Sequence, residues 1–408
     1  MTSWGILSPE DTPNFRRQQT LELAAAVRHF NDRSVPGLGG MWFAMPILWS
    51  VISVAIAQEL KRPALPISNA IEARVMKHVL QRSDITVSPQ VRGRRKLANV
   101  DPAFATLSRP GTYVVQPIRM TMIQPLVSLG FVKGRRYSAF VLAAAGERLL
   151  DLPSVRAARH LLGRWARGEN PRGLGSTLDG LSPLSLPDPA VRKLIMSRLV
   201  DGDDPDSRRR RDLVRVGTGP TASQLEARDP LPGISVDHWR DLRAGAAFMD
   251  LQQIALSVLS KIDAELHQRR DRNSEAKLTA AEAAVVANEK LSYLKSQAAL
   301  MEDRIVAGAE PLSCAFLREC LTLSPEELAT RLAGRDGSVV TLRGEMLTLG
   351  PAGEHAAEAV PRDDSPGGPA ESPFAPQLFR LRNLHCLVTE LGGKANPRTA
   401  EHSIGEIA

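Results

Sequence analysis

Apolar residues recur every three or four positions along most of the 408-residue chain, and this spacing predicts a mainly helical protein. The first such pattern indicates an amphipathic helix at 15–31. A later helix is expected to begin at Ser68, because serine often caps a helix N-terminus, and its apolar face recurs every fourth residue from Ile71. Patterns typical of short strands occur at 131–142 and 339–349. We therefore expect mainly α structure with small β hairpins.

The segment 36–57 has no charged residue over 22 positions, which is long enough for a membrane-spanning helix. Three glycines near its start weaken the helix and Pro46 interrupts it, so the regular part is shorter than a bilayer requires. A helix buried in the protein core is the favoured interpretation. The alternative, a protein anchored in a membrane through 36–57, stays open at this point.

Residues 112–150 contain a helical pattern, two short strand patterns and a second helical pattern, in that order. Lys133, Arg135 and Arg136 occupy the turn between the strands, and Arg119 lies on the preceding helix. This order resembles the recognition helix and wing of a winged-helix domain. The resemblance implies a wing that contacts phosphates or a minor groove, and an Arg119 side chain that faces a major groove.

The clearest helical spacing in the chain lies at 236–307, in two stretches separated by a polar segment. The second stretch begins at Thr279 with Glu282 three residues later, which is the pattern of a capping box. We expect the two helices to fold back as a long antiparallel helical hairpin. Before them, an acidic cluster, the arginine run 208–211 and several Gly and Pro residues predict an exposed linker.

The C-terminal part is expected to hold a small α+β module and one further helix. Residues 351–375 are rich in Pro, Gly, Ser and acidic residues, a composition typical of disorder. The final amphipathic pattern predicts a helix that either docks back on the protein or binds a partner. The expected organisation is a basic helical domain at 1–200, a charged linker at 201–235, the helical hairpin at 236–307, the small helical and hairpin module at 308–350, a disordered linker at 351–375 and the C-terminal helix at 376–394.

Charge is divided unevenly along the chain. Residues 1–215 contain 32 Lys and Arg against 18 Asp and Glu, whereas the remainder contains 20 against 27. Most of the excess lies at 61–198, with 23 basic and 8 acidic residues. Such a basic region is typical of proteins that bind a polyanion, although a GC-rich genome explains the 42 arginines equally well. The candidate nucleic-acid-binding residues are Arg92, Arg94, Arg95, Lys96, Arg119, Lys133, Arg135 and Arg136.

Sequence motifs for catalysis are absent. The sequence contains no phosphate-binding loop, serine-hydrolase elbow, zinc-protease motif or kinase catalytic loop. Cys314, Cys320 and Cys386 lack the spacing of a zinc site. The pair Glu275 and Lys277 lies between two expected helices rather than on the strand that a nuclease site requires. We therefore expect a non-enzymatic protein without a metal or cofactor.

The context of the protein is predicted from its opening and its last helix. The opening lacks the basic and apolar segments of a signal peptide, so a cytoplasmic location is expected. Residues 4–40 and 379–391 resemble uncharacterised accessory proteins encoded in bacterial phage-defence islands. The resemblance implies a subunit that acts beside a partner ATPase or nuclease.

Together these features predict a cytoplasmic, non-enzymatic subunit of a bacterial multi-protein complex for antiviral defence. Its basic half is expected to bind double-stranded DNA, and its helices at 236–307 and 376–394 are expected to bind a protein partner. Two alternatives stay open besides this one. They are an interaction scaffold without nucleic-acid binding, whose basic half meets an acidic protein, and the membrane-anchored protein.

Overall fold

The computed structural model describes residues 19–82, 88–217, 220–272, 276–354 and 378–397. The chain forms two compact units: unit 1 is Met1–Arg28 with Ala247–Val360, and unit 2 is His29–Ala246 with Pro361–Ala408. Unit 2 contains 37 Lys and Arg against 25 Asp and Glu, a net charge of +12. Unit 1 contains 15 against 20, a net charge of −5. The charge asymmetry seen in the sequence therefore separates the two units.

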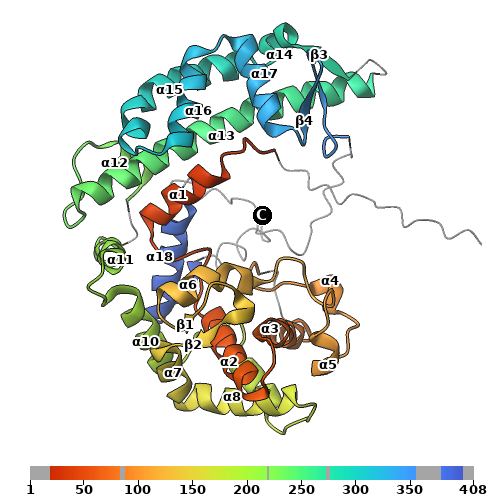
Figure 1. Cartoon of the computed structure of the whole chain (residues 1–408), viewed down its shortest axis with the longest axis vertical. Helices are drawn as coiled ribbons and strands as arrows, with labels where there is room; N and C mark the ends of the chain where they lie inside the picture. The colour runs from red at the N-terminus through yellow and green to blue at the C-terminus, as the bar shows by residue number, and fades with distance from the viewer. Residues whose placement is uncertain (1–18, 83–87, 218–219, 273–275, 355–377, 398–408) are drawn as a thin grey trace, which may run out of the picture. The chain divides into compact units, whose positions relative to one another are not determined.

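Unit 2 is built around α2 (Met45–Leu60), the helix that the uncharged segment forms (Figure 1). Its residues 45–57 are all buried, and the indole Nε1 of Trp49 donates to the Leu181 carbonyl oxygen at 2.9 Å. Pro46 stands in the first turn, where proline is tolerated, so it starts the helix instead of interrupting it. In the part of the chain that the structure describes, no helix is long and apolar enough to cross a membrane. This burial agrees with the prediction that the uncharged segment forms a helix in the protein core.

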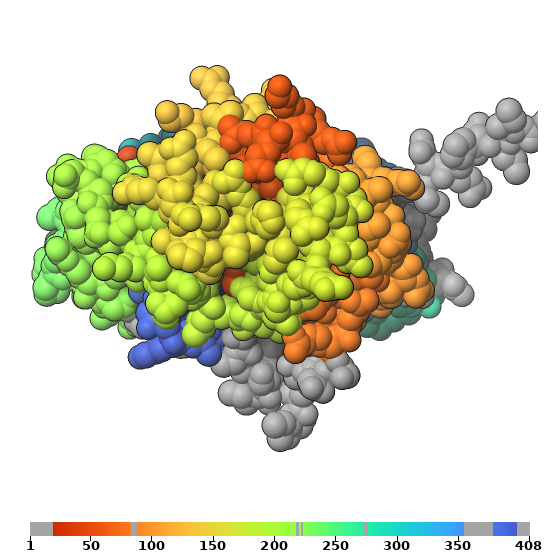
Figure 2. Space-filling view, turned by 90° about the horizontal axis from the view of Figure 1, so that it is seen from below, coloured from red at the N-terminus to blue at the C-terminus, as the bar shows by residue number. Residues whose placement is uncertain are grey.

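Several helices surround α2 and complete the unit 2 core. Figure 2 shows one face of this unit, on which the yellow segments of α8 and α9 adjoin the red and orange segments of α2 and α3. The helices that pack directly on α2 are α3 (Ala64–Leu80), α7 (Ala144–Asp151) and α8 (Pro153–Ala166). The others are α4 (Arg94–Leu97), α5 (Phe104–Leu107), α9 (Leu174–Gly180), α10 (Pro189–Val200), α11 (Pro205–Arg215) and α12 (Ala222–Glu226).

Two helix starts differ from the prediction. The first helix, α1, spans Ala24–Ser34 instead of 15–31, of which residues 15–18 lie outside the described ranges. The prediction that Ser68 caps α3 is wrong, because α3 begins at Ala64 after Pro63. Ser68 is instead buried within the helix, and its hydroxyl shares a hydrogen bond of 2.7 Å with the Tyr137 hydroxyl. This serine therefore makes a tertiary contact and does not cap the helix.

The segment 112–150 has the predicted order of elements. It comprises η1 (Ile118–Met122), α6 (Ile123–Ser128), β1 (Val132–Lys133), η2 (Tyr137–Ala139), β2 (Val141–Leu142) and α7. The two strands pair antiparallel, with Lys133 opposite Val141. The expected single helix before the hairpin is a 3₁₀ turn that continues into a short α-helix.

The segment 201–235, expected to be an exposed linker, instead contributes to the unit 2 core. The arginine run lies within α11, and Arg210 is buried. Its guanidinium donates to the carbonyl oxygens of Leu199 and Pro36, each at 2.7 Å. Four adjacent arginines suggest exposure in a sequence, but the helical turn directs one of them inward.

The last helix, α18 (Phe379–Leu391), also packs into unit 2. Leu381, Leu384, Leu387 and Leu391 are buried in the same apolar core as α2. The Glu390 carboxylate accepts from the Ala44 backbone N at 3.1 Å. Of the two expectations for 376–394, docking on the chain itself is the one observed.

Unit 1 contains most of the predicted helical hairpin together with the small module. The hairpin region holds α13 (Val236–Asp271), β3 (Lys277–Thr279), α14 (Ala280–Val286) and α15 (Asn288–Ala307). The module holds α16 (Pro311–Thr322), α17 (Pro325–Asp336), β4 (Val340–Arg343) and β5 (Met346–Leu349). From residue 355 on, the predicted disordered linker lies outside the described residues.

The boundary expected at 307 is not a domain boundary, because a strand joins the two regions. β3 follows α13 and pairs antiparallel with β5, giving a sheet in the order β3-β5-β4. α14 packs on α17, and α15 packs on α16. The prediction missed β3, since three residues are too short for a periodic signal.

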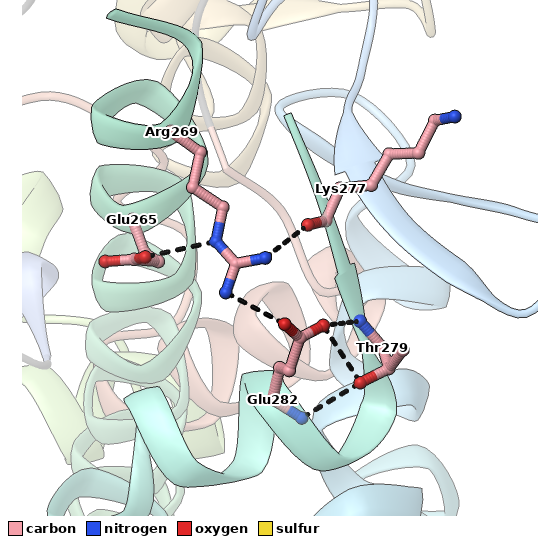
Figure 3. A network of polar contacts seen from close by, with 5 residues as sticks. All are labelled: Glu265, Arg269, Lys277, Thr279 and Glu282. Atoms are coloured by element: carbon pink, nitrogen blue, oxygen red, sulfur yellow. Dashed lines mark hydrogen bonds and ion pairs between the residues drawn. The ribbon is translucent and has the colours of Figure 1, made fainter. Parts of the chain in front are cut away.

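A polar network fixes the corner between β3 and α14 to α13 (Figure 3). The guanidinium of Arg269 donates to Glu265 at 3.2 Å, to the Lys277 carbonyl oxygen at 2.9 Å and to Glu282 at 3.1 Å. Glu282 also accepts from the Thr279 backbone N at 2.8 Å, and the Thr279 hydroxyl accepts from the Glu282 backbone N. The predicted capping box is confirmed.

Candidate nucleic-acid interface

The turn of the β1–β2 hairpin carries three of the predicted site residues. Lys133, Arg135 and Arg136 are all exposed. Within the described residues, no hydrogen bond or ion pair reaches any of these three side chains. Residues paired directly across two strands point to the same face, so the Lys133 ammonium lies on the side of the hairpin where Val141 is exposed. We call Lys133, Arg135 and Arg136 the basic loop.

Several arginines of unit 2 have an acidic partner, unlike the basic loop. Arg159 pairs with Glu59, Arg82 with Asp179, and Arg33 with Asp241. A cation that is neutralised within the fold has less to gain from an added phosphate. The basic loop differs from these positions because its positive charge is not compensated by a neighbouring carboxylate.

Buried residues hold the basic loop in place. Tyr137 follows Arg136 directly, is buried, and bonds to Ser68 on α3. Burial raises the pKa of Tyr137 to about 12, so its hydroxyl keeps its proton at neutral pH. The ring of Phe140 lies against that of Tyr137, with 5.1 Å between centroids. The loop backbone is therefore anchored although its charged side chains are exposed.

Arg119 is placed differently from the basic loop. Its guanidinium Nη1 donates to the Asn69 side-chain oxygen at 3.0 Å, and its backbone N donates to Glu72 at 3.1 Å. The side chain expected to face a major groove is thus bound to α3. Three of the four exposed positions of η1 and α6 are apolar: Met120, Ile123 and Val127 are 55%, 38% and 40% exposed, and the fourth is Ser128. Apolar side chains do not read the hydrogen-bonding edges of bases, apart from the thymine methyl group.

The sequence pattern did not single out Glu72, whose side chain on α3 connects this helix to Tyr113 and to the start of η1. Its buried carboxylate accepts from the backbone N of Ile118 at 2.7 Å, from that of Arg119, and from the Tyr113 hydroxyl at 3.2 Å. Burial raises the pKa of Glu72, and the Arg119 charge opposes that rise. The available signal was a carboxylate next to Ile71 on the apolar face of a helix.

The basic run 92–96 forms a second cluster, which we call the α4 cluster. Arg94, Arg95 and Lys96 are exposed on and around α4, whereas Arg92 is half-buried and donates to the Gln116 carbonyl oxygen at 2.5 Å. Gly93 precedes α4 with a φ of 84°, and a Cβ there would meet the Tyr113 ring at 2.8 Å. Only glycine fits that conformation and that contact.

Both basic clusters rest on α3. Ser68 holds the hairpin, and the Lys77 ammonium holds the end of α4 by donating to the Leu97 carbonyl oxygen at 2.9 Å. Nine residues of α-helix separate these two supports, a distance of about 14 Å along the axis. Nine residues also correspond to about 2.5 helical turns, so the two supports lie on opposite sides of α3.

The described residues also include cysteines and acidic side chains that could react or bind a metal. Among the described residues, no cluster of three or more His, Cys, Asp and Glu side chains is arranged to hold a metal ion. Cys320 and Cys386 are buried, and burial raises the pKa of the Cys320 thiol to about 12. The expectation that the pair Glu275 and Lys277 lies off any strand is wrong for Lys277, which is the first residue of β3, whereas Glu275 lies outside the described residues.

No protein-family model, curated protein or solved structure matches this chain.

Proposed function

We propose that unit 2 binds double-stranded DNA through the basic loop and the α4 cluster, as a non-enzymatic module of a larger assembly. The observation that carries this proposal is that three uncompensated cations stand together on the basic loop, whereas arginines such as Arg82 and Arg159 are paired with carboxylates. An anchored loop with free cations loses little conformational entropy when it meets phosphates. The net charge of +12 on unit 2 favours the same class of ligand.

The proposed contact uses the hairpin as the wing of a winged-helix-like segment. The order of η1, α6, β1, β2 and α7 supports that arrangement. Because Arg119 is bound to α3 and the exposed side of α6 is apolar except for Ser128, the proposed contact is to the phosphate backbone. Binding of this kind depends strongly on salt and weakly on base sequence.

The test reverses the charge of the basic loop. In the variant Lys133→Glu, Arg135→Glu, Arg136→Glu, affinity for a labelled duplex measured by fluorescence anisotropy is expected to fall at least tenfold, because three phosphate contacts become repulsive. The slope of log K against log salt is expected to decrease by about 2–3. A single-stranded probe measured in parallel separates duplex binding from general polyanion binding.

The matched control reverses three exposed arginines elsewhere in unit 2, at Arg109, Arg172 and Arg228. It has the same change in net charge, so equal losses in the two variants would contradict the assignment to the basic loop. If the unchanged protein binds no duplex even at low salt, the whole proposal fails and the scaffold without nucleic-acid binding takes its place.

A second candidate function is protein binding by α14 and α15. Val285, Tyr293, Leu300 and Val306 are all more than half exposed on these helices. Tyr293 and Leu300 are seven residues apart and lie on the same helical face. Exposed apolar residues in this arrangement favour a protein contact. The proposed partner class, an ATPase or nuclease of a bacterial defence complex, comes from the resemblance of the opening residues and the last helix.

The partner proposal is tested by size-exclusion chromatography with any ATPase or nuclease that proves to be encoded beside this chain. A complex is expected with the unchanged protein and not with the variant Tyr293→Glu, Leu300→Glu. A complex that survives both substitutions would place the contact elsewhere.

A further inference from the structure

Unit 1 has an open groove of about 620 Å³ along one side of α17. It lies at a point where four elements meet: α17 forms its length, while α14, α16 with the residue that follows it, and β4 contribute the rest. Its volume is in the range of sites that hold small ligands or peptide side chains. The lining residues are Ala280, Glu319, Leu323, Glu326, Glu327, Thr330, Arg331, Gly334 and Leu342.

The floor of the groove is apolar. Leu323 and Leu342 are half-buried there, and Ala280 lies beside them. Gly334 is within the last turn of α17 and has an ordinary helical φ, so its backbone does not require glycine. A Cβ at this position would already lie 3.4 Å from the Leu342 side chain. The missing side chain at 334 therefore keeps this end of the groove open, although glycine disfavours a helix.

One wall of the groove is rigid. Glu319 accepts from Arg331 at 2.8 Å and from Arg335 at 2.9 Å. The Arg335 guanidinium also lies over the Phe316 ring, at 5.5 Å from its centroid. A wall that is fixed by two charge-assisted bonds does not need to rearrange when a ligand enters.

The rim of the groove is acidic. Three carboxylates line it, on Glu319, Glu326 and Glu327, against one guanidinium, on Arg331. Glu327 caps its helix by accepting from the Ser324 backbone N at 2.8 Å. Glu326 is exposed, and its carboxylate has no bonding partner among the residues that the structure describes. Because Arg335 also pairs with Glu319, the local excess is one negative charge, which favours a cationic ligand.

We infer that this groove binds a peptide segment of a partner protein in which an aliphatic or aromatic side chain stands next to Arg or Lys. The apolar side chain would fill the floor between Leu323 and Leu342, and the neighbouring cation would face Glu326. Such pairing of an apolar anchor with a charge at the rim is typical of peptide recognition. This inference is independent of DNA binding by unit 2 and uses a surface other than Tyr293 and Leu300.

The inference is tested by selecting a phage-displayed random peptide library on the full-length protein. The selected peptides are expected to be enriched in an apolar residue adjacent to Arg or Lys. Gly334→Leu, which fills the groove, is expected to weaken a selected synthetic peptide at least tenfold, because the floor is blocked. Glu326→Lys is expected to weaken it about threefold or more, and Glu345→Lys, an exposed carboxylate outside the lining, serves as the control of equal charge.

Four outcomes would overturn the inference, the last of them self-association. The first is a library without enrichment of basic and apolar pairs. The second is a selected peptide that binds Gly334→Leu and Glu326→Lys as tightly as the unchanged protein. The third is binding that occurs only after residues 1–18 are deleted, which would assign the groove to the chain's own segment containing Phe15, Arg16 and Arg17. Self-association that Gly334→Leu abolishes would likewise assign it to a second copy.

Discussion

The Arg269 network of unit 1 and the basic loop of unit 2 both place cations beside a short strand, but their surroundings differ. Arg269 donates to two carboxylates and one carbonyl oxygen, so its charge joins α13, β3 and α14 (Figure 3). The side chains of the basic loop have no such partner in the described parts of the chain. The same residue type therefore stabilises the fold in one region and stays available to a ligand in the other.

We expect paired and unpaired charges to respond differently to substitution in both units. A change at a paired charge should alter the free energy of unfolding and leave ligand affinity alone. A change in the basic loop should do the opposite, because exposed charges without partners contribute little to stability. Paired groups beneath the basic loop, such as Glu72, give the strongest test.

The largest effect is expected for Glu72→Ala. The substitution leaves two backbone N–H groups and the Tyr113 hydroxyl without their acceptor in the core. The free energy of unfolding, measured by urea denaturation, is expected to fall by about 3–5 kcal/mol. Glu147→Ala, which removes an exposed carboxylate from α7, is the control and is expected to change it by less than about 0.5 kcal/mol. A loss below about 1 kcal/mol for Glu72→Ala would contradict the role assigned to this carboxylate.

The contrast between Glu72 and the basic loop also illustrates what the sequence could reveal. Helical spacing located α2, α13, α15 and the hairpin at β4–β5, because each repeats a local pattern. The capping box at Thr279 was visible for the same reason. Exposed cations such as Lys133 could be listed as candidates, since charged residues are seldom buried.

The remaining features depend on contacts between distant segments. Serine is a typical helix-capping residue, but the Ser68 hydroxyl shares a hydrogen bond with that of Tyr137, which lies 69 residues away. Arg210 looks like part of an exposed run, yet it donates to Pro36, 174 residues away. The pairing of β3 with β5 is equally non-local. No periodic signal in a single sequence carries such information.

The next effect in size concerns pH and tests a paired group at α18. Glu390 accepts from the Ala44 backbone N and from Asn396, and burial raises its pKa from 4.5 to about 7. The folded protein then holds a proton that the unfolded chain releases above about pH 4.5. The contribution of Glu390 to stability is therefore full below pH 4.5 and is lost as the pH rises towards 7.

The measurement compares the unchanged protein with Glu390→Gln by urea denaturation at several pH values. Gln stays neutral throughout. The free energy of unfolding of the unchanged protein is therefore expected to fall by about 2 kcal/mol relative to that of Glu390→Gln between pH 5 and 7.5. Other titrating groups are common to both proteins and cancel in the difference. A difference that stays constant over this range would show that Glu390 titrates near its ordinary pKa.

The smallest effect is expected at the Arg269 network of unit 1. Glu282→Ala removes an acceptor of Arg269 and one half of the capping box at Thr279, all near the surface. Exposed pairs and caps of this kind are weak, so Tm is expected to fall by only about 3 °C. Glu289→Ala, which removes an exposed carboxylate from the first turn of α15, is the matched control and should leave Tm unchanged.

The decisive readout for Glu282→Ala is DNA affinity measured on the same sample. It is expected to stay within about twofold of the unchanged protein, whereas the reversed basic loop loses affinity at constant Tm. The opposite pattern, in which Glu282→Ala weakens DNA binding, would mean that Arg269 takes part in the contact once its partner is gone. A paired cation would then differ from an unpaired one only because its partner keeps it from the DNA phosphates. The distinction between cations that stabilise the fold and cations that bind a ligand would no longer hold in this protein.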